Sequence, residues 1–281
     1  MAQKVVLVTG ATDGIGKATA IMIAKQSSYQ LVIHGRSPER VAATADEIKR
    51  CCPQAKVGVL VADLSSLAEV SRMIREVNEK FSNLTILVNN AGLMMKGHST
   101  TEDGFEMTMG VNYFAPFALT LGLLPILKRN QPSRIIHVSS VAHTRFTKKV
   151  DVADLNCERT PFHSYTQYSL SKLANVMFSQ ELHRRLRREE SYAKVTTNSL
   201  HPGVITTKLL LSGFGMGGDP VEQGAKTSSF LALSSTVEDV SGEYYDDCRR
   251  VESNPTASDE KQCEALWKAS LIATKMVGYQ M

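Results

Sequence analysis

Short apolar runs alternate with segments of helical period along almost the whole chain, and no other feature limits its fold as strongly. Near-continuous apolar strands between helices are typical of a parallel sheet that helices cover on both faces. We therefore predict an α/β fold in which one domain, residues 1–281, forms a doubly wound sheet of seven parallel strands. Ligands of such a sheet bind at the carboxyl ends of its strands, near the point where the strand order reverses. The expected strands are residues 5–8, 31–33, 57–61, 86–88, 134–138, 195–200 and 242–245, and the clearest expected helices are residues 15–26, 38–51, 67–81 and 168–188.

Charge and composition favour an ordinary globular protein that binds no nucleic acid. The formal net charge is only +4, and 43% of the residues are hydrophobic. The densest basic cluster, residues 183–188, is followed at once by Glu189 and Glu190. This pattern indicates the solvated face of a helix rather than a surface for nucleic acid or membrane.

Cysteine usage and the longest apolar stretch indicate a soluble, cytoplasmic protein. The cysteines are scattered and no pair has zinc-ligand spacing, so reduced thiols fit best. The histidines form no metal-spaced set either, and no metal is expected. A strand begins by residue 4, so no signal peptide is expected. Residues 113–127 are too few to span a membrane and contain two prolines, which predicts a buried helix and no membrane span. The cysteines are Cys51, Cys52, Cys157, Cys248 and Cys263.

A glycine-rich turn joins the first predicted strand to the first predicted helix, with the sequence Thr9-Gly10-Ala11-Thr12-Asp13-Gly14-Ile15-Gly16. The first glycine permits a sharp turn, the second lets the backbone approach a pyrophosphate, and the third allows close packing of the helix. The N-terminus of the helix supplies free N–H groups for the anion. Its position between a strand and a helix predicts a Rossmann dinucleotide site, and the alternative is a tight turn without a ligand.

The end of the second predicted strand favours NADP(H) over NAD(H). NAD sites usually place an acidic residue there, which holds the ribose 2′-hydroxyl. Here the strand ends with Gly35 and Arg36, and Arg36 offers a planar, permanently charged group suited to a 2′-phosphate. Ser37 and Pro38 then predict a helix start, with Arg40 close by. Alternatively, Arg36 is a surface residue whose stem covers the adenine.

Tyr168 and Lys172 lie four residues apart in a segment predicted to be helical, so both side chains share one face. The pair suits proton transfer to or from an alcohol or carbonyl oxygen. A phenol titrates near pH ~10, and a fixed ammonium one turn away is expected to lower its pKa. Of the eight tyrosines, only Tyr168 has a lysine at this spacing.

These motifs together resemble those of the short-chain dehydrogenase/reductase family. They are Thr9-Gly10-x-x-x-Gly14-Ile15-Gly16, Asn89-Asn90-Ala91-Gly92, Asn112, Ser139-Ser140, Tyr168-x-x-x-Lys172 and Pro202-Gly203, in the family's order. Residues 137–143, 171–175, 201–204 and the tail from residue 241 to 267 are similar to the retinol dehydrogenase-like branch.

The resemblance implies a role for each catalytic residue. Tyr168 would be the acid–base residue, and Lys172 would lower its pKa and hydrogen-bond the nicotinamide ribose. Ser140 would donate to the substrate oxygen, with Ser139 as the alternative because a register error of one residue would exchange them. Asn112 would hold a water that connects Lys172 to solvent, although it could instead stabilise a kinked helix.

The glycine turn, the strand ends and the resemblance together predict the residues that contact the cofactor. The resemblance implies that Asp63 and Leu64 border the adenine and that the nicotinamide itself carries the hydride. It also implies that the nicotinamide carboxamide is met by Pro202, Gly203, Val204 and Thr207. The full set is Gly10, Thr12, Asp13, Gly14, Ile15, Gly16, Arg36, Arg40, Asp63, Leu64, Asn90, Ala91, Gly92, Tyr168, Lys172, Pro202, Gly203, Val204 and Thr207.

The sequence departs from many family members between Ser140 and Tyr168, which are 28 positions apart (168 − 140). The extra stretch, residues 145–164, is expected to form a loop or short helix beside the pocket. Because of this stretch, the family's usual subunit packing is not predicted for this chain, although a homodimer is possible. The expected absence of an N-terminal apolar anchor, which membrane-bound members of the branch carry, makes a retinoid substrate less secure.

Glycines alternate with large apolar residues in residues 209–218, which predicts a mobile lid around residues 205–225 over a lipophilic substrate. Met94 and Met95 are expected to add adaptable apolar surface. The alternative is a loop that buries its own leucines.

The leading hypothesis is an NADP(H)-dependent oxidoreductase that interconverts a lipophilic aldehyde or ketone and its alcohol. A non-catalytic NADP(H) sensor is the second, and the intact set of Asn112, Ser140, Tyr168 and Lys172 argues against it. A sugar epimerase or dehydratase of the extended branch is the third. Such chains usually have a larger C-terminal substrate domain, for which there is little room.

Overall fold

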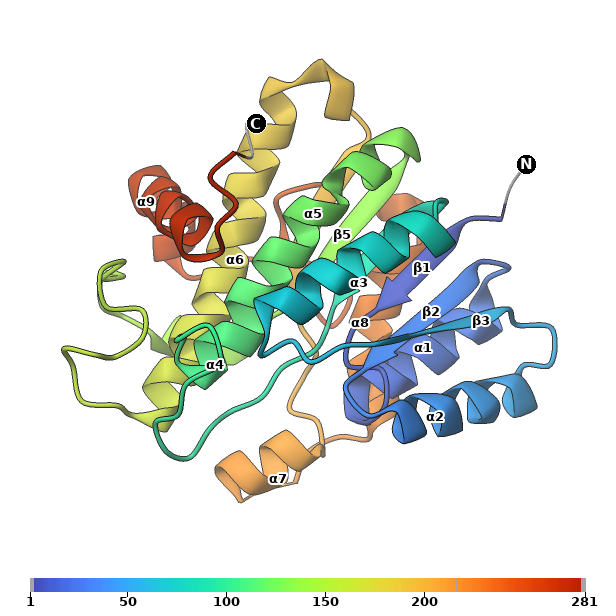
Figure 1. Cartoon of the computed structure of the whole chain (residues 1–281), viewed down its shortest axis with the longest axis horizontal. Coiled ribbons are helices and arrows are strands. Elements are labelled where there is room, and N and C mark those ends of the chain that lie inside the picture. Colours follow the sequence, from blue (N-terminus) through green and yellow to red (C-terminus); the bar gives the residue numbers. More distant parts are fainter. Residues whose placement is uncertain (1–2, 216, 279–281) are drawn as a thin grey trace.

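The computed structural model describes residues 3–215 and 217–278. Residues 1–2 and 279–281 of the predicted domain, and Met216 of the predicted lid, lie outside the described residues. The described chain forms one doubly wound α/β domain, as predicted (Figure 1).

The sheet of the described residues has eight strands in the order β3-β2-β1-β4-β5-β6-β7-β8. The prediction of seven parallel strands is confirmed for β1 to β7, but the total of seven is wrong because a short strand, β8, pairs antiparallel with β7. The order reverses between β1 and β4, so a crevice is expected at that point. The strands are β1 (Val5–Val8), β2 (Gln30–Gly35), β3 (Val57–Val61), β4 (Leu84–Asn89), β5 (Ser133–Val138), β6 (Val195–His201), β7 (Tyr244–Asp246) and β8 (Arg249–Val251).

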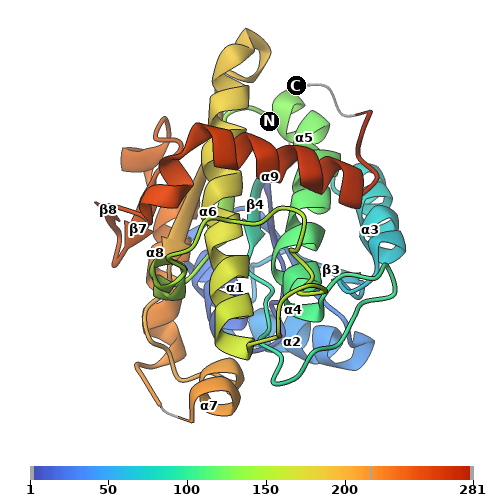
Figure 2. The ribbon, with the colours of Figure 1, turned by 90° about the vertical axis from the view of Figure 1, so that its left-hand side faces the viewer.

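Helices cover both faces of the sheet, and each face has its own hydrophobic core. Helices α1, α2 and α8 pack on one face, whereas α3, α5 and α6 pack on the other. Helix α9 lies across the outside of α5 and α6 (Figure 2), where Trp267 packs against Phe117 and Phe178 with ring centroids 5.3 and 5.8 Å apart. The helices are α1 (Gly14–Gln26), α2 (Pro38–Cys51), α3 (Leu67–Lys80), α4 (Met107–Met109), α5 (Ala115–Arg129), α6 (Ser164–Arg188), α7 (Lys208–Phe214), α8 (Val221–Leu233) and α9 (Glu260–Ala273).

A five-residue π-helix, Gly110–Phe114, joins α4 to α5. Together they form the one helix of the described residues, Met107–Arg129, that is long and apolar enough to cross a membrane by length and composition. Its most apolar window is 89% buried inside the fold, which is the behaviour of a core helix. The buried helix predicted at residues 113–127 is therefore observed, and the absence of a membrane span stays a prediction.

Helix α6 begins at Ser164, four residues before the predicted start at Tyr168. His163 caps it, because its side chain accepts a hydrogen bond from the Thr166 N–H at 3.3 Å. Tyr168 and Lys172 therefore lie in the second and third turns, where both side chains are buried. The stretch before α6 contains a 3₁₀-helix, Val141–Arg145, and then irregular chain.

Candidate functional site

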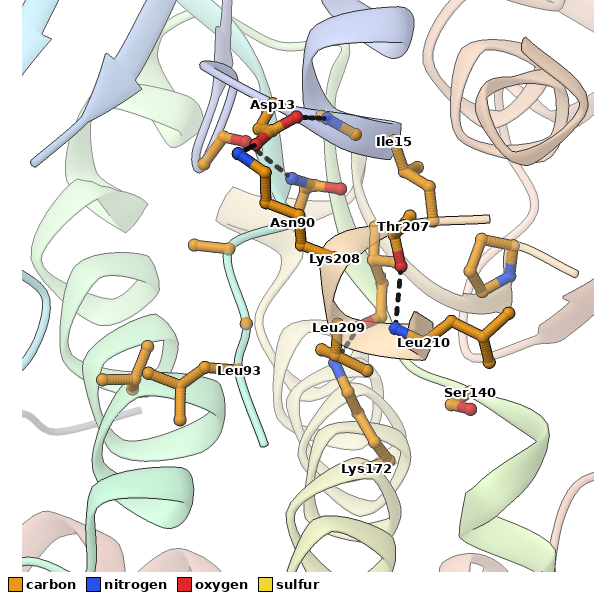
Figure 3. Close-up of a pocket in the computed structure, with 18 of the residues that line it drawn as sticks. Asp13, Ile15, Asn90, Leu93, Ser140, Lys172, Thr207, Lys208, Leu209 and Leu210 are labelled. Carbon is orange, nitrogen blue, oxygen red and sulfur yellow. Dashed lines mark hydrogen bonds and ion pairs between the residues drawn. The ribbon is translucent and has the colours of Figure 1, made fainter. Parts of the chain in front are cut away.

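A cleft of about 900 Å³ lies at the carboxyl ends of the parallel strands, at the predicted crevice (Figure 3). The segments that follow β1, β2, β3, β4, β5 and β6 each contribute lining residues, because the carboxyl ends of parallel strands meet at one edge of the sheet. Asp13 and Lys208 lie toward one end of the cleft, whereas Ser140 and Lys172 lie toward the other.

The glycine turn after β1 is shaped to receive an anion. Gly10 has φ +64°, and a Cβ there would come within 2.8 Å of the Ala91 Cα. A Cβ on Gly16 would come within 2.3 Å of the Gly10 carbonyl oxygen, so glycine is required at both positions. The first turn of α1 faces the cleft with backbone N–H groups that have no acceptor within the helix. The residues present therefore fit a dinucleotide.

Asp13 is the N-cap of α1 and pairs with two cations at the same end of the cleft. Its carboxylate accepts from the Gly14 N–H at 2.8 Å and pairs with Arg40 at 2.9 Å and Lys208 at 2.7 Å. The hydrogen bond from Lys208 is the largest influence that holds the Asp13 pKa below its ordinary value, with the Gly14 N–H adding to it. Arg36 lines the cleft beside them, is exposed, and has no hydrogen bond or ion pair with any described residue.

Tyr168 and Ser140 meet toward the other end of the cleft, where a side-chain hydrogen bond joins them. The Ser139 hydroxyl is instead buried and donates to the backbone carbonyl of Lys172 at 2.7 Å. Ser140 is therefore the serine whose hydroxyl can reach a substrate oxygen, and Ser139 has a structural position.

The prediction that Lys172 lowers the pKa of Tyr168 is wrong in direction. Burial raises the pKa of Tyr168 to about 12, against the opposing effect of its hydrogen bond with Ser140. The Lys172 ammonium lies 5.6 Å from the centre of the tyrosine ring and donates to the Val138 carbonyl at 3.0 Å instead. Burial lowers the pKa of Lys172 itself to about 8. The helical spacing correctly predicted that Tyr168 and Lys172 share one face of the helix. It could not predict that the Lys172 ammonium points to the Val138 carbonyl.

Asn112 is the one predicted site residue that does not line the cleft. Its amide lies behind the loop that follows β4, where it accepts from the Leu93 N–H and donates to the Leu93 carbonyl. It also donates to the Ser171 hydroxyl at 3.0 Å. A Cβ on Gly92 would lie 3.3 Å from both the Asn112 Oδ1 and the Lys172 Nζ, so Asn112 is close to the lysine. Asn112 lies in the π-helix, and both its role in holding a water and its role in stabilising a kinked helix stay predictions.

Every predicted cofactor residue lines the cleft, but several also serve the fold. The Asn90 amide donates to the Thr9 carbonyl at 2.8 Å and braces the glycine turn. Asp63 accepts from the Ser65 backbone and hydroxyl at 2.9 and 2.8 Å.

Several lining residues were not predicted from the sequence, because most of them lie in no local pattern that indicates a site. Arg145, at the end of the 3₁₀-helix after Ser140, and Lys208, at the start of α7, are two such residues. Met107 lines the cleft, whereas Met94 lies against α7, since a Cβ on Gly213 would come within 3.1 Å of the Met94 sulfur. The contribution of Met94 and Met95 to the substrate surface stays a prediction. The missed lining residues include His34, Leu93, Met107, Val111, Arg145, Tyr165, His201 and Lys208.

The predicted lid begins with α7, which Thr207 caps by accepting from the Leu210 N–H at 3.2 Å. Leu209 and Leu210 line the cleft, while Leu211 is 51% exposed. Among the described residues, no group of three or more His, Cys, Asp and Glu side chains is arranged to hold a metal ion.

The described geometry agrees with the comparisons. A short chain dehydrogenase family profile matches residues 4–212, so the chain belongs to that family and is an oxidoreductase of its type. Retinol dehydrogenase 13 of Mus musculus is 38% identical over 293 residues, which span 99% of this chain and 85% of that protein. Retinol dehydrogenase 14 of Homo sapiens is 38% identical over 305 residues, spanning 99% and 87%. The resemblance to the retinol dehydrogenase-like branch is therefore confirmed.

Solved structures share the fold. A protein from Mycobacterium paratuberculosis has a TM-score of 0.80 and 29% identity, with 98% of this chain and 94% of that chain covered. L-Sorbose reductase from Gluconobacter frateurii, complexed with NADPH and L-sorbose, has a TM-score of 0.69 and 22% identity, with 87% and 94% covered. At that identity the likeness to the reductase shows the fold alone.

Lys172→Met should make the cofactor-free protein more stable at pH 7. Because burial lowers the Lys172 pKa to about 8, the charged form penalises the folded state below that pH. The penalty fades as the pH rises from there toward 10.5, the ordinary value, where the unfolded chain also loses the proton. At about 1.4 kcal/mol per pKa unit, and allowing for the lost hydrogen bond to Val138, the expected gain is about 1–3 kcal/mol.

Urea unfolding at pH 7 and pH 10 measures the free energy of unfolding of Lys172→Met and wild type. The extra stability of the variant should be smaller at pH 10 than at pH 7. The exposed Lys226 provides the control, since Lys226→Met should change the unfolding free energy by less than about 0.5 kcal/mol at either pH. A loss of stability in Lys172→Met at both pH values would contradict the inference that the ammonium is poorly compensated.

Proposed function

We propose that this protein is an NADP(H)-dependent oxidoreductase that interconverts a lipophilic aldehyde or ketone and its alcohol. The observation that carries the proposal is the meeting of Tyr168, Ser140 and Lys172 toward one end of a cleft whose other end is a glycine-lined helix N-terminus. This arrangement can bind a dinucleotide and present an acid–base group to a substrate oxygen in the same cavity.

Tyr168 is the proton donor in this proposal. Its pKa is raised to about 12 by burial, so the hydroxyl is protonated at neutral pH and can give its proton to a carbonyl oxygen. Ser140, hydrogen-bonded with Tyr168, can donate to the same oxygen and stabilise the charge that develops there. The bound nicotinamide supplies the hydride. A protonated tyrosine favours reduction as the direction.

The proposed preference for NADP(H) depends on Arg36. Arg40 is already paired with Asp13, whereas Arg36 has no partner among the described residues and stands at the tip of β2. A ribose 2′-phosphate supplies the anion that its planar guanidinium can bind through two hydrogen bonds. The glycine turn and the N-terminus of α1 would hold the pyrophosphate.

The proposed lipophilic substrate follows from the apolar part of the cleft lining. Leu93, Met107, Val111, Leu209 and Leu210 all contribute to it. Two relatives that cover nearly the whole chain are named retinol dehydrogenases, and retinol is a lipophilic alcohol. A long apolar carbonyl or alcohol is the matching substrate class.

We further propose that α7 is the lid and that Lys208 fastens it to the glycine turn. The pair between the Lys208 ammonium and the Asp13 carboxylate, both of which line the cleft, joins α7 to the start of α1 (Figure 3). A bound cofactor would leave only after this pair opens.

Tyr168→Phe should lower kcat for carbonyl reduction at least about 1,000-fold, because the proton donor is lost while the ring remains. The dissociation constant for NADPH should change by less than about twofold. The kcat is measured by stopped-flow loss of NADPH absorbance across a panel of aliphatic and polyene aldehydes and ketones. The dissociation constant is measured by fluorescence titration with NADPH. Wild-type protein that binds NADPH but turns over no member of the panel would favour the sensor instead.

Arg36→Asp should raise the KM for NADPH about 100-fold or more and change the KM for NADH far less, since only NADPH carries the 2′-phosphate. Steady-state kinetics with both cofactors measure the ratio. Arg50→Asp is the matched control, because Arg50 is also exposed but lies in the last turn of α2. Equal effects of Arg36→Asp on the two cofactors would remove the assignment of NADP(H).

Lys208→Gln and Asp13→Asn should each speed the release of NADP(H) about two- to fivefold, because exposed ion pairs contribute only up to about 1 kcal/mol. Release is measured by chasing bound NADPH with excess NADP⁺ in a stopped-flow fluorimeter. Because salt screens ion pairs, wild-type protein at high salt should release NADPH about as fast as the variants do at low salt. If Lys208 only contacted the cofactor, Asp13→Asn would not accelerate release, and the fastening role would be refuted.

A further inference from the structure

Two histidines outside the proposed chemistry hold the peptide group that follows Ser140. The carbonyl of Ser140 and the N–H of Val141 belong to one peptide unit, and each is bonded to a different imidazole ring. We propose that His143 and His201 are positioning residues that fix this peptide group and thereby aim the Ser140 hydroxyl at the substrate oxygen. The inference rests on the proposed function, in which Ser140 and Tyr168 act on that oxygen.

His143 holds the carbonyl side of the peptide group. Its Nδ1 lies 2.7 Å from the Ser140 carbonyl oxygen, and its own backbone N–H donates to the same oxygen at 3.1 Å. Its Nε2 accepts from the backbone N–H of Asn254 at 3.1 Å. The ring is 1% exposed and packs against Tyr244 with centroids 4.5 Å apart. Because Nε2 accepts, the proton of the neutral ring is on Nδ1, which donates to Ser140.

His201 holds the amide side from the opposite direction. This residue ends β6 and is 7% exposed, and its Nδ1 accepts from the Val141 N–H at 3.1 Å. The proton of the neutral ring is therefore on Nε2. Burial is the first cause that lowers the pKa of both His143 and His201, which favours neutral rings in both. The two histidines thus need opposite tautomers.

The clamp explains why Ser140 can stay extended at a strand end. Ser140 caps the 3₁₀-helix Val141–Arg145, and its hydroxyl accepts from the Ala142 N–H at 3.2 Å while it also bonds with Tyr168. Loss of the two imidazole bonds would free the backbone that carries Ser140, and its hydroxyl would no longer be held beside Tyr168. Asn254 adds a distant anchor, because its side-chain amide donates to the carbonyls of His143 and Phe146 at 3.0 and 2.9 Å.

The tautomers provide a test that needs no activity. Long-range ¹H–¹⁵N spectra of protein labelled with ¹⁵N-histidine distinguish the two neutral forms of an imidazole. At pH 7.5 we expect His143 with its proton on Nδ1 and His201 with its proton on Nε2. The same tautomer in both rings, or a charged ring in either, would overturn the clamp.

Kinetics of matched variants test whether the clamp positions Ser140. His143→Phe and His201→Leu should lower kcat about 10- to 100-fold, the range expected for a misplaced catalytic group. His143→Asn keeps an N–H near the Nδ1 position and His201→Asn keeps an oxygen acceptor there, so each should recover most of the loss. The dissociation constant for NADPH should stay within about twofold of wild type in all four variants, and thermal unfolding shows whether each is folded.

His183→Asn is the control, because His183 also bonds through Nδ1, to the Ser241 hydroxyl at 2.9 Å, but on the far part of α6. Its kcat should equal that of wild type within about twofold. Folded His143→Phe with an unchanged kcat would refute the positioning role. Wild-type protein without carbonyl turnover would instead remove the proposed function, and the tautomer spectra would then decide the clamp on their own.

Discussion

Lys172 fastens α6 to the end of β5 through both its backbone and its side chain, and the arrangement of the whole site depends on these bonds. Its carbonyl accepts from the Ser139 hydroxyl at 2.7 Å, and its ammonium donates to the Val138 carbonyl at 3.0 Å. Both bonds are buried, so water does not compete for them. Because Tyr168 lies one helical turn before Lys172, the same attachment sets Tyr168 against Ser140, which follows Ser139 on the strand end.

The cofactor end of the cleft is held by a comparable set of hydrogen bonds from neighbouring strands, of which the bond from His34 to Ala62 is buried and the others are part-buried. The Gly10 N–H donates to the Nδ1 of His34 at 3.3 Å, and the Nε2 of His34 bonds the Ala62 carbonyl at 3.0 Å. Burial lowers the pKa of His34 to about 4, so the ring stays neutral and can accept from the turn. With Asn90 bonded to the Thr9 carbonyl, the glycine turn has supports from β2 and from the end of β4. A turn fixed in this way keeps its remaining N–H groups directed at an anion without a large loss of entropy on binding.

The sequence predicted most of the fold, because strands and helices here follow local patterns of apolar residues. Strand 57–61 and helix 38–51 match β3 and α2 to the residue. Strand β8, with Arg249 and Arg250 among its three residues, has no apolar pattern and forms only because β7 offers it an edge. The candidate site shows the same contrast between features that local patterns predict and features that depend on distant contacts. The glycine turn and the residues after each strand could be placed from their order in the chain. Other features depend on contacts between distant segments, which local patterns do not contain. These features are the direction of the Lys172 ammonium, the presence of Arg145 and Lys208 in the cleft lining, and the bonds of His143 and His201 to one peptide group.

The direction of the Tyr168 pKa shift changes how the pair with Lys172 should be understood. A lysine that lowered the pKa of Tyr168 in the cofactor-free protein would expose a partly ionised phenol before any substrate arrived. Burial does the opposite here, since it raises the pKa of Tyr168 to about 12 and lowers that of Lys172 to about 8. At pH 7 the Tyr168 hydroxyl is therefore neutral, whereas Lys172 still carries its proton and loses it only as the pH rises past about 8. Such a site is ready to donate a proton to a carbonyl oxygen. Removing a proton from an alcohol would first require a positive charge close to Tyr168, which an oxidised nicotinamide ring provides and a reduced one does not.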